Sequence, residues 1–509
     1  MSNASPLDET FPDAQDTPEG LDSSLNFIPS SGGTGIQEPA ATTTMTENGH
    51  GVTKSASFLD VRSVDASSVP PLKRSKLSTV VNLLEAKTAV QEHENEIAEV
   101  VIVCEPEQAS LMMGGLHPRG SLYERPINID TAKQQHGEFR KVLREHGVRV
   151  LTVREILAHH VDTNMSARVD LEELAFEALK YEMAQGHDLV SLAEEDRHYL
   201  SDVYKREVIS AMSTTQLIDT VMTNPTVSLL PSYRDTGLTA SYRFEPLSNL
   251  VYTRDQQITT CRGIVMGRLR SAQRQREVQV MRFCFNKLGM AVAGEIREPG
   301  FLEGGDFFPM GSDLAMAGIG LRSNIEACKQ LMDEDLLGTR RFAVVRDEFD
   351  QHQDRMHLDC VFSVLSDHCC IMLADIMGDS SKTRRLVDEY TRDAASGKYK
   401  LTRGNVEFSA FISGEGYHII PISNEHQLQY ACNVLNLGES RIISVHPQSA
   451  RQIVKDPRFN GDVQVIDFSS ITSMYGSVHC ASQVVKRIPR KALGLEDAAI
   501  TELELSGMI

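Results

Sequence analysis

Apolar and polar positions follow different patterns in different parts of the chain. Up to about residue 78, apolar residues are sparse and show no period, and Ser, Thr, Gly, Pro, Asp and Glu predominate. A segment of this composition cannot bury enough apolar surface to fold, so residues 1–78 are predicted to be a disordered tail. Beyond it, apolar runs recur at the spacings of strands and helices, which predicts one large folded domain over residues 79–509.

Short apolar runs alternate with helical patterns in most of the folded region. Val100–Cys104 and Val148–Val153 are typical of buried strands, and the residues from Ala132 to His146 have helical spacing. After Pro225, short strands separated by Gly and Pro return, with helices between them. Strands and helices that alternate in this way predict an α/β fold.

Residues 166–222 interrupt this alternation. Apolar residues at helical spacing fill Ala167–Met183, Leu192–Met212 and Thr215–Met222, and there is almost no strand signal between them. The pattern therefore predicts an all-helical insert over residues 166–222, contained within the α/β domain.

Charge and cysteine content narrow the class of protein. The net charge is −19, whereas nucleic acids and anionic membranes are bound by basic surfaces, so neither is an expected partner. No apolar stretch approaches the ~20 residues of a membrane-spanning helix, and no secretory or mitochondrial leader pattern is visible. The nine cysteines are scattered and odd in number, which is typical of reduced thiols. A cytoplasmic protein is the expectation.

Four short segments place polar groups beside apolar runs, and none of them is specific alone. Leu250–Thr253 predicts a strand that ends in the pair Arg254–Asp255, which a surface ion pair would also explain. Glu303 and Asp306 flank a Gly-Gly pair inside an apolar run, where acids are uncommon unless they are paired. An Asp/Gly turn between two strands is the alternative for that segment.

The other two segments contribute a histidine and a cysteine. If Met356–Phe362 is a strand, His357 and Asp359 point to the same face, because side chains alternate along a strand. A lone His-x-Asp is more often structural. Cys480 follows a glycine-containing turn and has polar neighbours in the sequence, as is typical of a reactive thiol. Most of the other cysteines lie in apolar runs.

In combination these segments resemble arginine deiminases. Tyr252-Thr253-Arg254-Asp255, Glu303-Gly304-Gly305-Asp306, Met356-His357-Leu358-Asp359 and a late Cys480 occur in the order found in that family. The resemblance extends from about residue 97 to residue 490 and includes the helical insert. It implies the pentein fold of the guanidine-modifying superfamily, with five pseudo-repeated α/β modules around a central site. The tail then corresponds to the N-terminal extension of a eukaryotic-like form.

The resemblance also implies roles for five residues at the reacting centre. Cys480 matches the nucleophile that attacks the guanidinium carbon, and His357 matches the general acid and base. Asp255 and Asp359 match the two carboxylates that hold the guanidinium nitrogens, and Glu303 matches the acid that orients the histidine. Paired carboxylates suit a planar cation with a fork of donors, and a delocalised guanidinium is a poor electrophile that needs a thiolate.

Further positions match residues around the rest of the substrate. Asn249 matches a residue near the α-amino group, and Tyr252 matches an aromatic residue that packs on the substrate chain. Arg268 and Arg322 match two arginines that contact the α-carboxylate. Asp306 is expected to fix a loop close to the substrate.

The segment before the nucleophile departs from bacterial arginine deiminases. Those enzymes have a third arginine five residues before the cysteine, where this chain has Tyr475, and Gly476–Cys480 is closer to amidinotransferases and agmatine deiminases. The leading expectation is hydrolysis of L-arginine to citrulline and ammonia. Amidino transfer, an arginine dihydrolase reaction and arginine binding without turnover stay open, and a product assay separates them.

No metal and no organic cofactor are expected. His159–His160 and His368–Cys370 have no partner pair at zinc-like spacing, and the glycine-containing segments lack the context of nucleotide-binding loops. The expected ligand is a small guanidine compound, and the resemblance suggests a homo-oligomer.

Overall fold

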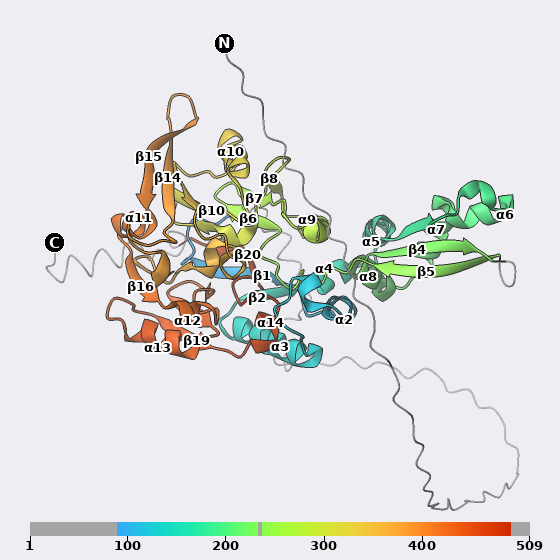
Figure 1. Ribbon diagram of the computed structural model, residues 1–509, viewed down its shortest axis with the longest axis horizontal. Helices are drawn as coiled ribbons and strands as arrows, with labels where there is room; N and C mark the ends of the chain where they lie inside the picture. The colour runs from blue at the N-terminus through green and yellow to red at the C-terminus, as the bar shows by residue number, and fades with distance from the viewer. Residues whose placement is uncertain (1–88, 233–236, 490–509) are drawn as a thin grey trace, which may run out of the picture. The chain divides into compact units, whose positions relative to one another are not determined.

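The computed structural model describes residues 89–232 and 237–489 (Figure 1). The predicted tail, residues 1–78, lies outside these ranges, so its disorder and the start of the folded domain stay predictions. Within them, Val100–Cys104 and Val148–Val153 correspond to strands and Ala132–His146 to a helix, as the apolar pattern predicted.

Five sheets share one three-stranded arrangement, which two further strands extend in the sheet of β9, β10 and β11. In each sheet the first strand runs antiparallel to the second, and the second runs parallel to the third. The sheets, in the order first–second–third, are β20 (Gln483–Ile488), β1 (Ile97–Val103) and β2 (Arg149–Thr152); β6 (Gln257–Thr260), β7 (Gly263–Met266) and β8 (Val292–Glu295); β9 (Phe307–Pro309), β10 (Leu314–Ile319) and β11 (Arg341–Arg346); β12 (Phe362–Val364), β13 (Cys369–Leu373) and β16 (His418–Ile422); and β17 (Leu435–Asn436), β18 (Arg441–Ser444) and β19 (Asp462–Val465).

A helix connects the second strand of each sheet to the parallel third strand. These connecting helices are α3 (Ile129–Glu145), α9 (Gln275–Lys287), α10 (Ile325–Asp333), α11 (Phe408–Gly414) and α13 (Pro447–Lys455). Parallel strands need such a crossover, because a tight turn cannot join them. The five repeated strand–strand–helix–strand modules confirm the predicted α/β pentein fold.

The two ends of the folded region meet in one sheet. β20 comes from the end of the chain and pairs with β1, which comes from its beginning, as Figure 1 shows in red and blue. This pairing completes the first module with a strand that is almost 390 residues away in sequence. Cys480 lies just before β20, so the same pairing places the predicted nucleophile next to the start of the fold.

Helix α3 illustrates why these segments form helices. Asn128 caps its first turn, where the side-chain Oδ1 accepts a hydrogen bond from the backbone N–H of Thr131 at 3.0 Å. Ala132, Phe139 and Leu143 follow at helical spacing and are buried against the first and fifth sheets. Smaller elements complete the modules, namely α2 (Gln108–Gly115), α4 (Val153–Ala158), α12 (Asn424–Gln427), α14 (Ser469–Thr472) and the added strands β14 (Leu386–Arg392) and β15 (Tyr399–Glu407).

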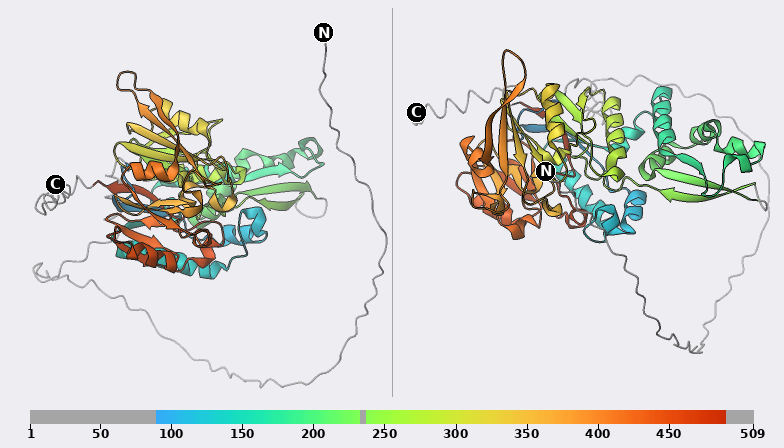
Figure 2. Two further views of the ribbon diagram at one scale, coloured as in Figure 1. Left: turned by 60° about the vertical axis from the view of Figure 1, so that its left-hand side comes forward. Right: turned by 45° about the horizontal axis from the view of Figure 1, so that its top comes forward.

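Residues 166–222 contain one strand, β3 (Lys180–Met183), as well as helices, so the prediction that this insert is all-helical is wrong. Its helices are α5 (Met165–Ala178), α6 (Glu194–Arg197), α7 (Asp202–Ser210) and α8 (Thr214–Thr223). The strand β3 forms a three-stranded sheet with β4 (Pro225–Pro231) and β5 (Leu238–Phe244), which follow residue 222 (Figure 2).

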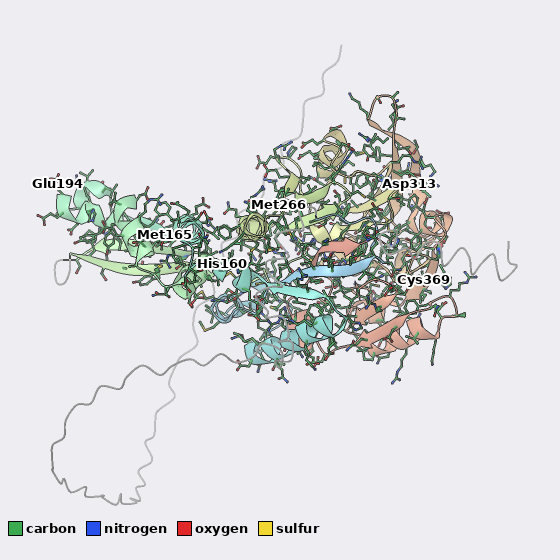
Figure 3. The ribbon with its side chains drawn as sticks, turned by 180° about the vertical axis from the view of Figure 1, so that it is seen from behind. His160, Met165, Glu194, Met266, Asp313 and Cys369 are labelled. Carbon is green, nitrogen blue, oxygen red and sulfur yellow. The ribbon has the colours of Figure 1, made fainter. Side chains whose placement is uncertain are left out.

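The strand that the prediction missed is β3. Residues 180–183 were assigned to a helix, but α5 ends at Ala178 and the next residues pair in parallel with Thr226–Leu229. That partner lies more than 40 residues later in the chain, and local periodicity carries no information about it. The chain enters the insert through the segment marked by His160 and Met165 in Figure 3.

None of the helices in the two described ranges is long and apolar enough to cross a membrane.

Candidate active site

Four of the predicted site residues lie shortly before the first strands of their modules. Asp255 precedes β6, Glu303 precedes β9, His357 precedes β12 and Cys480 precedes β20. Because the modules repeat, these connections occupy equivalent positions, and the side chains converge although the residues are far apart in sequence.

Two of these segments do not have the predicted local structure. Leu250–Thr253 is not a strand but a pair of turns, closed by the hydrogen bond from Tyr252 N to Asn249 O at 3.0 Å. Leu358–Cys360 is a single 3₁₀ turn and not part of a strand. In both segments the apolar side chains are buried, as they would be in a strand, but the backbone does not pair with a neighbouring strand. The apolar pattern of the sequence therefore predicted correctly which side chains are buried, but not whether the backbone pairs in a sheet.

A small cavity brings most of the predicted residues together. Its lining includes the predicted Asn249, Tyr252, Asp255, Arg322, His357 and Cys480. It also includes residues that were not predicted, namely Leu122, Arg274, Gln353, Met356, Met474 and Tyr475. The remaining predicted residues lie behind the lining or outside the cavity.

His357 is held between two carboxylates. Its Nε2 lies 2.8 Å from Oε2 of Glu303, and its Nδ1 lies 3.8 Å from Oδ1 of Asp255. Burial would lower the pKa of His357, but the charges of Asp255, Glu303 and Asp306 outweigh it and raise the pKa to about 10. Burial would also raise the pKa of Glu303, which the hydrogen bond and charge of His357 instead lower. At neutral pH this histidine is therefore an imidazolium, ready to donate a proton.

Gly305 lets the segment that carries Glu303 pack closely against the segment that carries His357 and Asp359. A Cβ atom at this position would lie 2.7 Å from Nδ1 of His357 and 3.2 Å from Oδ1 of Asp359. The Gly-Gly pair therefore serves close packing behind the histidine.

Cys480 is a buried thiol in a negatively charged environment. Burial raises the pKa of its thiol well above the usual value, and the nearby Asp359 and Asp255 raise it further. The Sγ lies 3.5 Å from Oδ2 of Asp359. A cation bound in the cavity would offset these effects, so the thiolate is expected when a cationic ligand is present.

Asp359 lies behind the nucleophile and is held by a histidine that the sequence analysis missed. Its Oδ2 accepts a hydrogen bond from Nδ1 of His479 at 2.8 Å. Burial would raise the pKa of Asp359, but the hydrogen bond and charge of His479 lower it. His479 in turn stacks on Phe308 and lies 3.6 Å from Glu94. Its position next to Cys480 was the available signal, but its partner Glu94 is remote in sequence.

Asp306 has the predicted loop-fixing arrangement. Its Oδ2 accepts a hydrogen bond from Oγ of Ser323 at 2.6 Å, and its Oδ1 accepts one from the backbone N of Leu358 at 2.8 Å. Leu358 follows His357 directly, so these bonds hold the histidine segment in place. Burial raises the pKa of Asp306 to about 6.

Arg268 lies outside the cavity, where it pairs with Glu298 at 2.6 Å and stacks on Phe301. Arg274 lines the cavity instead and pairs with Asp255 at 2.9 Å. A sequence signal for Arg274 exists: it follows Asp255 by 19 residues, the same number by which Arg322 follows Glu303. By position in the module, Arg268 and Arg322 are the closer equivalents, because they follow the second strands β7 and β10 by two and three residues, whereas Arg274 follows β7 by eight.

Asp255, Glu303 and His357 could in principle hold a metal ion, because ligand atoms of all three lie within 4.8 Å of one another. A histidine must lose its proton to bind a metal, and the two carboxylates that would share the ion also stabilise the imidazolium. The arrangement suits a retained proton better than a metal.

Comparison with known proteins assigns the family. The sequence profile described as arginine deiminase matches residues 120–487. The chain belongs to the arginine deiminase family. Among its relatives is an arginine deiminase of Halobacterium salinarum, 22% identical over 324 residues, with 48% of this chain and 65% of the relative covered. An arginine deiminase of Staphylococcus aureus is 23% identical over 262 residues, with 48% and 59% covered. The chain thus spans about three fifths of the length of these curated relatives.

Solved structures of related enzymes show a weak overall likeness. A DDAH from Pseudomonas aeruginosa in complex with citrulline is 15% identical, with a TM-score of 0.44 and coverage of 77% of this chain and 100% of that one. The N-terminal domain of ArgZ, a cyanobacterial arginine dihydrolase, bound to product, is 13% identical, with a TM-score of 0.43 and coverage of 76% and 97%. Both scores are below 0.5, and the repeated strand order itself establishes the fold of this arginine deiminase family member.

Replacing Glu303 by Gln is expected to move the alkaline limit of turnover to lower pH. Glu303 raises the pKa of His357 to about 10 together with Asp255, so the imidazolium persists below that pH and is lost as the pH rises through it. Removing one negative charge lowers this pKa, and the acid is lost earlier. A pH–rate profile from pH 6 to 10 tests this.

Glu298→Gln is the matched control for that profile, because Glu298 is an exposed acid that pairs with Arg268 outside the cavity. An alkaline limit that moves equally in both variants, or in neither, would contradict the role given to Glu303.

Proposed function

We propose that this protein hydrolyses L-arginine to citrulline and ammonia through a covalent intermediate on Cys480. The observation that carries the proposal is the content of one cavity, which combines a thiol at Cys480, an imidazolium at His357 and a carboxylate at Asp255. Membership of the arginine deiminase family supports the same chemistry.

Substrate binding prepares the nucleophile. The guanidinium group enters a site whose fixed charges include Asp255 and the buried Asp359, and Oδ1 of Asp255 has no hydrogen-bond partner among the described residues. A carboxylate oxygen without a partner is the acceptor that a guanidinium N–H requires. The positive charge of the substrate lowers the pKa of Cys480, and the thiol proton leaves to solvent.

The first half-reaction forms the intermediate. The Cys480 thiolate attacks the guanidinium carbon, and a carbon–sulfur bond forms. His357 gives its proton to one terminal nitrogen, the carbon–nitrogen bond breaks, and ammonia departs. A thiouronium cation on Cys480 and a neutral His357 remain.

The second half-reaction releases citrulline. Neutral His357 takes a proton from water, and the resulting hydroxide adds to the same carbon. The carbon–sulfur bond then breaks, which restores the thiolate, and loss of a proton from the product gives citrulline. Glu303 holds the ring of His357 in place through both steps by its hydrogen bond to Nε2.

Arg322 is proposed to bind the α-carboxylate of the substrate. It lines the cavity and, within the described ranges, makes no ion pair, only a hydrogen bond of 3.4 Å to Gln353. Its Nε has no hydrogen-bond partner there either. Arg274 also lines the cavity, but its guanidinium is already shared between Asp255 and Glu277. Asn249 and Tyr252 are proposed to contact the rest of the amino-acid chain.

Arg322→Ala is expected to raise the KM for L-arginine about tenfold to a hundredfold, since a hydrogen-bonded charge contact is lost, with a smaller change in kcat. Steady-state kinetics with L-arginine measure this. Arg268→Ala is the matched control, because Arg268 lies outside the cavity, and its KM is expected to stay near the native value. A larger effect of Arg268→Ala than of Arg322→Ala would reverse the assignment.

Product analysis tests the proposal against its alternatives. Purified protein is incubated with L-arginine, and citrulline, ornithine and ammonia are separated by chromatography. Citrulline with one equivalent of ammonia supports deimination. Ornithine without citrulline indicates a dihydrolase, and turnover only with an added amine indicates amidino transfer, which the segment Gly476–Cys480 keeps open. Binding of arginine without any product indicates a silent member of the family.

A further inference from the structure

Asn433 occupies the equivalent position in the module that supplies none of the predicted site residues. It precedes β17, as Asp255, Glu303 and His357 precede the first strands of their modules. Its side chain is 2% exposed and lies directly against the nucleophile segment. Its Nδ2 is 3.2 Å from Sγ of Cys480.

The orientation of the Asn433 amide is fixed by the backbone around it. Its Oδ1 faces the backbone N–H groups of His479, at 3.2 Å, and of Cys480, at 3.4 Å. Backbone N–H groups can only donate, so the oxygen must face them and the NH₂ group must face the sulfur. The NH₂ group also donates to the backbone oxygen of Asp359 at 3.3 Å.

The surroundings of the sulfur make this donor significant. Two side chains in the described part of the chain lie within hydrogen-bond distance of Sγ, namely Asn433 and Asp359. Asp359 is an acceptor, which favours the thiol, whereas the amide of Asn433 is a donor, which favours the thiolate. A hydrogen bond from a neutral donor to a buried anion is one of the stronger kinds.

We propose that Asn433 is a further catalytic residue, whose side-chain amide donates a hydrogen bond to the Cys480 thiolate and holds the nucleophile segment through its oxygen. The inference rests on the proposed function for its role in turnover, but its effect on the thiol does not depend on which substrate is used. Because Asn433 touches the reacting atom, its loss changes the nucleophile itself and not only the stability of the fold.

The test measures the reactivity of Cys480 in the full chain. Native protein, Asn433→Ala and Asn433→Asp react with iodoacetamide at pH 8, and peptide mass analysis follows alkylation at Cys480 separately from the other cysteines. In both variants the rate constant at Cys480 is expected to fall about tenfold to a hundredfold, since a donor to the thiolate is lost. The Asp variant keeps an acceptor for the two backbone N–H groups, so it remains informative if the Ala variant does not fold.

Asn436→Ala is the matched control. Asn436 is equally buried in β17 and donates to the backbone oxygens of Val364 and Leu365, with no contact to Cys480. Its loss is expected to lower stability and to leave alkylation at Cys480 unchanged. Native-like alkylation of Cys480 in both Asn433 variants, or an equal decrease in Asn436→Ala, would overturn the proposal.

Arginine turnover is measured in parallel, so that the two proposals fail separately. If native protein makes no citrulline while the Asn433 variants react slowly with iodoacetamide, the deimination proposal fails and the role of Asn433 at the thiol stands. If native protein makes citrulline and the Asn433 variants react like native protein, the role of Asn433 fails and deimination stands.

Discussion

Replacement of Cys480 by Ser is expected to reduce citrulline formation from L-arginine by on the order of 10⁴-fold or more, as removal of a catalytic nucleophile does in other enzymes. A serine hydroxyl would stay protonated here, because a hydroxyl is a much weaker acid than a thiol and the burial and carboxylates that disfavour the Cys480 thiolate would act on an alkoxide as well. The guanidinium carbon would then meet no nucleophile. Ammonia and citrulline assays with L-arginine in excess measure the loss.

Cys261→Ser is the control for that experiment. Cys261 is only partly buried, and its sulfur contacts the backbone oxygen of Gln91, away from the cavity lining. Turnover in this variant is expected to stay near native. Substantial citrulline formation by Cys480→Ser would show that the covalent route proposed here is wrong.

Replacement of His357 by Gln is expected to reduce turnover by about 10²- to 10⁴-fold, the range that general acid–base catalysis contributes. Gln cannot deliver a proton to the departing ammonia, and it cannot take one from the attacking water. Substrate binding should persist, because Asp255 and Arg322 are retained. Single-turnover and steady-state measurements of citrulline together show which half-reaction is slower.

His418→Gln is the matched control for His357→Gln. His418 also pairs with a carboxylate, Asp456, at 2.9 Å, but the pair lies at the start of β16 and just after α13, outside the cavity lining. Both variants therefore lose a histidine–carboxylate pair, but only His357→Gln removes a residue of the proposed reaction. Equal turnover in the two variants would contradict the acid–base role of His357.

The sequence predicted the reacting centre more completely than its immediate support. Cys480, His357 and Asp255 were recognised from the order of short motifs, and the repeated modules bring them to one cavity. Asn433 and His479 were not recognised, because each acts through a contact with a distant part of the chain. Asn433 meets Cys480 only when β17 and β20 are in place.

The errors in the fold prediction have the same physical origin. Apolar spacing reports which side chains are buried, and it identified the buried Leu250 and Val251 correctly, but those residues form turns without a partner strand. Lys180–Met183 forms a strand because it pairs in parallel with Thr226–Leu229. Pairing depends on which segments meet in space, which local patterns do not contain.

The arginine assignments show where repetition in the sequence was informative. Arg322 and Arg274 follow the acids Glu303 and Asp255 at the same spacing, and both line the cavity. Arg268 was chosen from its local segment and lies elsewhere. The shared spacing marks two arginines that line the cavity, of which only Arg322 is proposed to bind the α-carboxylate.

The covalent intermediate on Cys480 is the central claim, and trapping it is the most direct test. Native protein and His357→Gln are mixed with L-arginine, quenched with acid during turnover, digested and examined by peptide mass analysis. The account predicts that the peptide containing Cys480 gains the mass of arginine less ammonia, with more adduct in the variant if water activation becomes slower than attack. The account would be contradicted if native protein makes citrulline while neither native protein nor His357→Gln carries an adduct on Cys480 at any quench time.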